Sequence, residues 1–105
     1  KEAGSFLASV ARSHQDTGVP LAFLAGGETT VHLTGSGLGG RNQELALAAA
    51  PGISGLRQTA VFSFGSDGTD GPTDAAGGYA DQDTLAALQS AGWDAVQTLR
   101  DNDAY

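Results

Sequence analysis

The spacing of hydrophobic positions along the chain predicts two long helices. Apolar side chains recur at intervals of three and four residues across residues 2–16, which indicates an amphipathic helix. Gly18 and Pro20 follow it, and this pair commonly ends a helix. Residues 41–50 are rich in leucine and alanine and predict a second helix, which the next two residues, a proline and a glycine, are expected to end.

Short apolar runs predict strands around these helices. Residues 21–25 and 59–64 are nearly continuous apolar runs followed by glycine, as is typical of buried strands. Residues 30–34 alternate apolar and polar side chains, which predicts a strand with one exposed face. Two short helices are expected to begin near residues 84 and 94. Together these elements indicate an α/β fold, with helices packed on a mixed sheet of three to five strands.

Composition limits the size of the core and the kinds of partner. The 105 residues, 40% of them hydrophobic, suffice for one domain with a modest core. The formal net charge is −7, and the five basic residues are scattered, so we expect neither nucleic-acid nor membrane partners. No apolar run approaches the ~18 residues of a membrane span. The absence of cysteine is compatible with a reducing cytoplasm.

Three carboxylates follow the strand predicted at residues 59–64. Asp67, Asp70 and Asp74 lie three and four residues apart in a stretch rich in glycine. Such a stretch can simply form turns, but the end of a buried strand is also where open α/β folds bind ligands. The carboxylates would suit Mg²⁺ held together with a ligand's phosphates, or one of them would act as general base toward a hydroxyl. Spacing alone does not divide these roles.

A glycine-rich stretch, residues 35–40, leads into the helix that begins at Arg41. Free N–H groups and the helix dipole make such a helix start a good anion site, and Arg41 would add a bidentate contact. The same residues can also form only a hydrated, capped first turn. Gly35, Gly37 and Gly40 match the G-x-G-x-x-G spacing of dinucleotide sites. The alternating strand before them and the lack of an acidic residue about 20 positions later argue against that interpretation.

Three stretches together resemble a known family. Residues 26–31, 39–44 and 65–77, with residues 102–105 as a later motif, resemble the C-terminal MOFRL domain of the glycerate 2-kinases, a family also labelled hydroxypyruvate reductase. The order and spacing of the stretches agree, and the similarity covers roughly residues 20 to 105.

The resemblance implies a cytoplasmic two-domain enzyme that moves the γ-phosphoryl group of ATP, with Mg²⁺, onto the 2-hydroxyl of D-glycerate. Its cleft would lie between an N-terminal α/β domain and this one. Arg41 would contact the substrate carboxylate or the transferred phosphate, and Asp67 or Asp70 would be the metal-linked or base carboxylate. The further substrate- or phosphate-binding residues implied are Glu28, Gly39, Gly40, Asn42, Glu44, Thr73 and Asp74.

Residues 1–105 would then be the MOFRL-like domain of that enzyme, truncated at its C-terminal end and separated from its N-terminal domain, so we do not expect the isolated chain to be active. Two other functions stay open: an NAD(P)H-dependent hydroxypyruvate reductase, and a non-catalytic domain that binds a small acid or holds subunits together. The sequence also leaves open whether the protein forms a homodimer.

Overall fold

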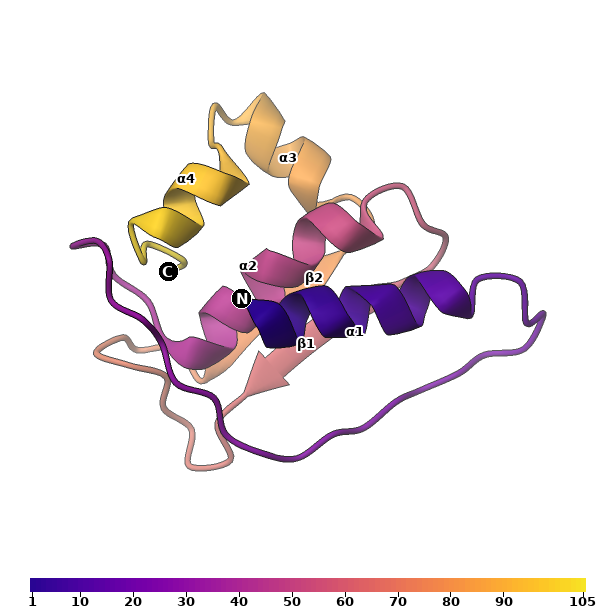
Figure 1. Ribbon diagram of the computed structural model, residues 1–105, viewed down its shortest axis with the longest axis horizontal. Coiled ribbons are helices and arrows are strands. Elements are labelled where there is room, and N and C mark those ends of the chain that lie inside the picture. Colours follow the sequence, from indigo (N-terminus) through magenta and orange to yellow (C-terminus); the bar gives the residue numbers. More distant parts are fainter.

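The computed structural model describes residues 1–105 and contains four helices and two strands (Figure 1). In chain order these are α1 (Glu2–Ser13), α2 (Arg41–Ile53), β1 (Ala60–Phe64), β2 (Gly77–Asp81), α3 (Thr84–Ser90) and α4 (Ala95–Arg100). The α/β class expected from the sequence is confirmed. None of the four helices is long and apolar enough to cross a membrane.

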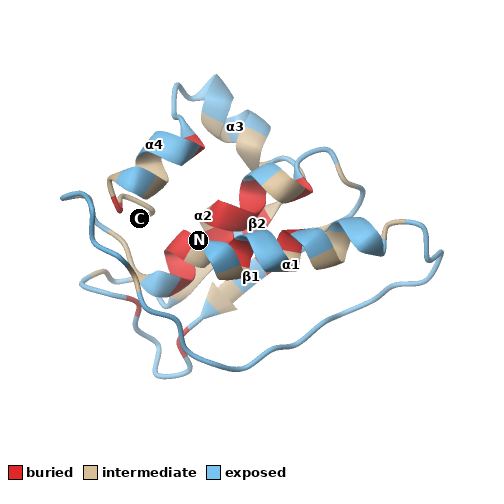
Figure 2. Cartoon of the chain, viewed as in Figure 1, coloured by how far each residue is buried: buried red, intermediate tan, exposed pale blue.

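Helix α2 is the centre of the fold. It packs against α1 on one side and against both strands on the other, and Figure 2 shows buried residues concentrated along it. The core consists of small side chains from α1, α2 and the sheet: Ala8, Ala49, Ala50, Ile53, Val61 and Ala80. Small residues let the elements approach closely. A Cβ on Gly4 would lie only 2.3 Å from the carbonyl oxygen of Leu45.

The sheet differs from the expected mixed sheet of three to five strands. It has two antiparallel strands, with Ala60 of β1 opposite Asp81 of β2 and Phe64 opposite Gly77. The sequence prediction missed β2 because two glycines open it, and glycine is rare in strands. Glycine is required there, since a Cβ on Gly78 would lie 2.9 Å from the Cα of Gln43 in α2.

The strands predicted at residues 21–25 and 30–34 are absent. Residues 19–33 run as an extended segment, and none of their backbone groups takes part in a backbone–backbone hydrogen bond. A strand needs a neighbour for its ladder, and the only paired strands in residues 1–105 are β1 and β2, which pair with each other. The apolar pattern correctly predicts an extended segment, but it does not predict whether another strand lies beside it.

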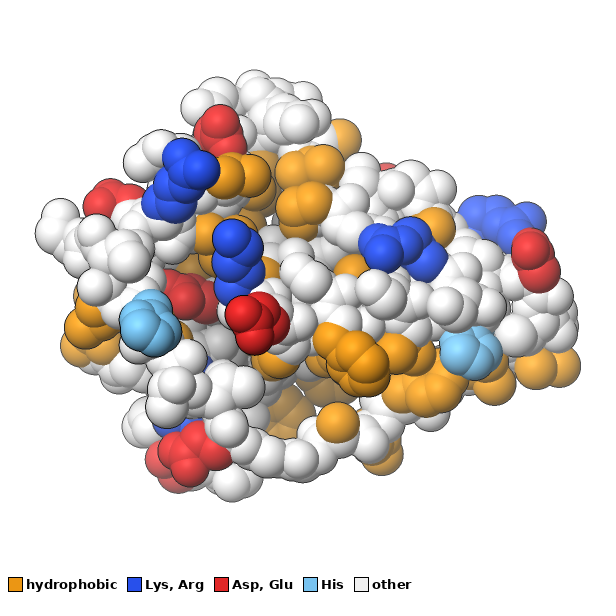
Figure 3. All heavy atoms as spheres, viewed as in Figure 1, with side chains coloured by type: hydrophobic (Ala, Val, Ile, Leu, Met, Phe, Trp, Pro, Cys, Tyr) orange, Lys and Arg blue, Asp and Glu red, His pale blue; other side chains and the backbone are white.

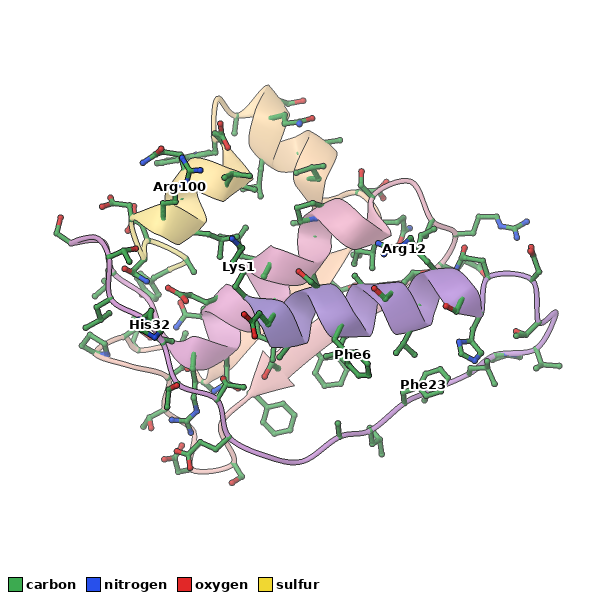
Figure 4. All side chains as sticks on the ribbon, viewed as in Figure 1. Lys1, Phe6, Arg12, Phe23, His32 and Arg100 are labelled. Carbon is green, nitrogen blue, oxygen red and sulfur yellow. The ribbon has the colours of Figure 1, made fainter.

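The extended segment and β1 together expose many large apolar side chains. Leu24 is 91% and Leu33 is 80% exposed, while Phe62 and Phe64 of β1 are more than half exposed. Figure 3 shows hydrophobic side chains gathered along the lower edge of the face in view. In Figure 4, Phe6 points from α1 toward the side on which Phe23 lies in the extended segment. So large an apolar surface commonly marks an interface.

Candidate functional site

The connection between β1 and β2, residues 65–76, folds back onto the start of α2; we call it the carboxylate loop. It meets the glycine loop, residues 35–40, at Gly71. The φ angle of Gly71 is 62°, and a Cβ there would lie 2.3 Å from the carbonyl oxygen of Gly39. Glycine alone satisfies both conditions. Two of the stretches singled out in the sequence are therefore in direct contact.

Asp70 lies at the centre of this contact and is only 2% exposed. Its carboxylate accepts hydrogen bonds from the backbone N–H groups of Asn42 and Gln43, at 3.0 and 2.8 Å. The side-chain amides of the same two residues donate to it as well, at 3.0 and 2.9 Å. Burial by itself raises the pKa of Asp70, but these hydrogen bonds outweigh burial, and its pKa lies below the usual value. Asp70 is therefore an ionised carboxylate at the N-terminus of α2.

This carboxylate fills the anion site that the glycine loop and helix start predict. Gly40, the residue before α2, makes the approach feasible, because a Cβ there would lie 2.4 Å from Cγ of Asp70. The expectation that Asp70 binds Mg²⁺ or accepts a substrate proton does not fit this geometry. Both of its oxygens already accept N–H donors, and the side chain is closed to solvent.

Asp67 is the contrasting carboxylate of the loop, because it is exposed to solvent. One oxygen accepts a hydrogen bond of 3.0 Å from the backbone N–H of Thr69. The pKa of Asp67 is lowered chiefly by its hydrogen bonds with Thr69 and, to a smaller degree, by the positive charge of Arg41. Asp67 thus stays ionised, open to a ligand and within electrostatic reach of Arg41.

Arg41 is the first residue of α2 and remains largely exposed. Its Nη1 atom lies 3.6 Å from Oε2 of Glu28, which belongs to the extended segment. The two side chains are 41% and 74% exposed, so this ion pair is weak and leaves the guanidinium free to bind an anion. Arg41, Glu28 and Asp67 come from three separate segments and gather at one end of α2.

Thr73 and Asp74 shape the end of the carboxylate loop. The Thr73 hydroxyl accepts from the side-chain amide of Gln43 at 3.0 Å and donates to the backbone carbonyl of Asp70 at 2.7 Å. Asp74 accepts a hydrogen bond from the hydroxyl of Tyr105, and this bond, with the negative charge of Asp74, raises the pKa of Tyr105. Both residues are thus engaged with neighbouring parts of the chain.

Asn102 belongs to the C-terminal motif, residues 102–105, but was not among the predicted site residues, and its role is structural. It is 5% exposed, and its side-chain amide donates to Oε1 of Glu44 at 2.6 Å and to the carbonyl of His32 at 3.2 Å. Its side-chain oxygen accepts from the N–H groups of Thr34 and Gly35 at 2.7 and 2.9 Å. Its φ of 56° is one that asparagine tolerates better than most residues, so an asparagine just after a predicted helix was the available signal.

Two residues predicted to line the cleft, Glu44 and Asn42, are buried in contacts with other parts of the chain. Glu44 is buried beside Asn102. Asn42 is buried as well, and its side-chain oxygen accepts from the hydroxyl of Ser63 in β1 at 2.5 Å. Neither side chain is open to a ligand, so both stabilise the surrounding structure and do not contact a ligand.

The G-x-G-x-x-G glycines lie against the chain itself. A Cβ on Gly35 would lie 2.3 Å from Cα of Asp101, and one on Gly37 would lie 2.3 Å from Cβ of Asp103. No strand precedes the loop, as it would in a dinucleotide-binding fold. These glycines allow the C-terminal residues to pack closely, and the geometry gives the dinucleotide interpretation no support.

The donors present fit a magnesium ion only when a ligand supplies most of the coordination. No group of three or more His, Cys, Asp or Glu side chains that could hold a metal occurs in residues 1–105. Mg²⁺ usually takes one or two carboxylates and completes its shell with water and substrate phosphates. Asp67, exposed and ionised, is suited to that role.

Comparison with known proteins identifies relatives of the whole chain. The MOFRL family matches residues 21–105. A D-glycerate 2-kinase of Thermotoga maritima is 49% identical over all of this chain, and a glycerate 2-kinase of Pyrococcus horikoshii is 42% identical. The chain spans about a quarter of the length of these relatives, 26% and 25%.

The architecture agrees with the sequence comparison. The crystal structure of a glycerate kinase from Thermotoga maritima superposes with a TM-score of 0.89, covering 99% of this chain and 26% of that one. The resemblance expected from the glycine loop, the carboxylate loop and the C-terminal motif is confirmed. The chain belongs to the MOFRL family.

Proposed function

We propose that this chain is part of an ATP-dependent glycerate 2-kinase, which transfers the γ-phosphoryl group of ATP to the 2-hydroxyl of D-glycerate. One observation carries the proposal: an exposed arginine at a helix start lies close enough to an exposed, ionised carboxylate of the adjoining loop for its charge to lower the pKa of that carboxylate. This pairing of charges suits an anionic substrate that must also lose a proton. Relatives named as glycerate 2-kinases support the choice of substrate.

The two exposed residues have separate roles. Arg41 binds the carboxylate of D-glycerate or the phosphoryl group in transit, through its planar pair of N–H donors. The 2-hydroxyl oxygen forms a bond to the γ-phosphorus while the bond to ADP breaks, and Asp67 accepts the hydroxyl proton or holds Mg²⁺. Bound Mg²⁺ would neutralise charge on the phosphates of ATP. Phosphoryl transfer depends on such positioning and neutralisation more than on covalent chemistry.

Much of the ATP site must come from outside this chain. Only one of its five basic residues, Arg41, lies at the proposed site, and ATP carries several negative charges. We assign the remaining contacts to an N-terminal α/β domain of the same cytoplasmic protein. The exposed apolar side chains of the extended segment and β1 would face that domain. The shares of the relatives' lengths, 26% and 25%, leave room for such a domain.

The test uses the full-length protein that contains this chain. One reaction receives D-glycerate with Mg-ATP, and a second receives hydroxypyruvate with NADH or NADPH. Glycerate-dependent release of ADP in the first reaction alone supports the kinase. 3-Hydroxypropanoate, which lacks the 2-hydroxyl group, is the matched control and should give none. Oxidation of the nicotinamide in the second reaction alone would replace the kinase by the reductase, and tight, magnesium-independent binding of the acid without turnover would indicate a binding domain.

A further inference from the structure

The anion at the N-terminus of α2 belongs to the protein itself. Asp70 occupies the two backbone N–H groups, those of Asn42 and Gln43, that would otherwise receive a phosphate or carboxylate of the ligand. We propose that Asp70 is a positioning residue, whose carboxylate fixes the first turn of α2 so that Arg41 meets the anionic substrate. The inference rests on the proposed function, and it assigns to Asp70 a role other than base or metal ligand.

The contacts of Arg41 explain why its position depends on the backbone. Its guanidinium forms one ion pair, with Glu28 at 3.6 Å, and both side chains are exposed. Such a contact does not hold a long side chain in one orientation. The two residues that follow Arg41 are held by four hydrogen bonds to Asp70, two from backbone and two from side chains. The direction in which Arg41 leaves α2 is therefore set by Asp70.

The same contacts restrict where a ligand anion binds. A helix start ordinarily attracts an anion through its free N–H groups and its dipole. Here the ionised carboxylate of Asp70 already accepts from the N–H groups of Asn42 and Gln43 and places a negative charge at the positive end of the dipole. The approach of the loop is so close that Gly40 has no room for a Cβ. A substrate phosphate or carboxylate near this end of α2 therefore finds the amides of Asn42 and Gln43 already bonded, and the Arg41 side chain is the charged donor left for it. The site thus selects ligands by a guanidinium contact.

The first test is a double-mutant cycle in the full-length enzyme, with D-glycerate and Mg-ATP. Asp70→Asn replaces one acceptor oxygen by an N–H₂ group that faces N–H donors. We expect kcat/KM for D-glycerate to fall about tenfold or more. Because Asp70 acts through Arg41, the double variant with Arg41→Ala should be no slower than Arg41→Ala alone. Additive losses would overturn the inference.

The pH profile separates a positioning residue from a base. Asp67→Asn should remove the acidic limb of the kcat/KM profile, whereas Asp70→Asn should lower the whole profile and keep that limb. Loss of the limb in Asp70→Asn would make Asp70 the base and would refute the inference.

If Asp70→Asn does not fold, Gln43→Ala offers a second test. It removes one side-chain donor to Asp70 and keeps both backbone amides. It should give roughly a threefold loss that is again absent when Arg41 is already alanine.

Amide hydrogen exchange tests the positioning role of Asp70 without an activity assay, so its result does not depend on the proposed function. Amide hydrogen exchange at Asn42 and Gln43 should be slow in the full-length protein and fast in Asp70→Asn, while Ala49 in the middle of α2 stays protected. Asp67→Asn is the matched control and should leave all three rates unchanged. Unchanged exchange at Asn42 and Gln43 in Asp70→Asn would contradict the inference, whatever reaction the protein catalyses.

Discussion

Two arginines of this chain form a matched pair for testing the site. Arg41 lies 3.6 Å from Glu28, and Arg57 lies 3.6 Å from Asp16. The side chains are exposed in both pairs, 41% and 74% in the first and 76% and 100% in the second. Ion pairs this exposed contribute little to folding, because water and salt screen them. Replacing either arginine by alanine should leave the thermal unfolding midpoint of the full-length protein nearly unchanged.

The effects on activity should differ. A charged hydrogen bond to an anionic substrate is worth about 1.5–3 kcal/mol, so Arg41→Ala should lower kcat/KM for D-glycerate by roughly 10- to 150-fold. Arg57→Ala removes a similar surface ion pair away from the carboxylate loop and should keep the wild-type rate. Arg41→Lys keeps the charge but loses the planar pair of donors, so its rate should fall between wild type and Arg41→Ala.

The assay is ADP release coupled to a reporter enzyme, measured across D-glycerate concentrations for wild type and the three variants. Thermal melts of the same samples establish that each variant is folded. A wild-type rate in Arg41→Ala would remove Arg41 from the site. Equal losses in Arg41→Ala and Arg57→Ala would also contradict a role for Arg41 in substrate binding, because the effect would then follow from lost surface charge and not from position at the helix start.

Three further outcomes follow from the same contacts. Asp67→Asn should lower kcat by about a hundredfold with little change in the melting temperature, because Asp67 is exposed and would act as base or metal ligand; rate and melting assays check both. Asn102→Asp sets a carboxylate against buried Glu44 and should destabilise the protein by roughly 2 kcal/mol, measured by denaturant unfolding. The pKa of Asp70 in the folded protein lies below the unfolded value of about 3.9. Its contribution to stability is therefore complete above that pH and is lost as the pH falls through the folded pKa. The melting temperature of Asp70→Asn should consequently fall less on acidification than that of the wild type.

The helices could be predicted from the sequence because their signals are local. Apolar spacing located α1 and α2, and the start of α2 at Arg41 follows from the glycine loop before it. Two details were wrong: α1 ends at Ser13 and not at residue 16, and α2 continues past Pro51 to Ile53. Helix ends depend on the last turn, where local signals are weakest.

The sheet and the roles of the carboxylates depend on distant contacts. The segment at residues 21–34 has strand-like composition, but pairing requires a neighbour that the pattern does not name. Asp67 and Asp70 look alike in the sequence, yet the contacts of Asp70 with residues 27 and 28 positions away close it to solvent while Asp67 stays open. Only the fold separates the two aspartates. The position of the carboxylate loop could be predicted from the sequence. Which of its aspartates is exposed to a ligand and which is buried in a structural role could be seen only in the structure.

The proposed transfer to the 2-hydroxyl of D-glycerate is tested most directly by following the phosphoryl group itself. The full-length protein is incubated with D-glycerate, Mg²⁺ and ATP labelled in its γ-phosphate, and the products are separated and identified. We expect the label to appear in 2-phosphoglycerate. Label found only in inorganic phosphate, or on the 3-hydroxyl of glycerate, would contradict the proposed transfer to the 2-hydroxyl group.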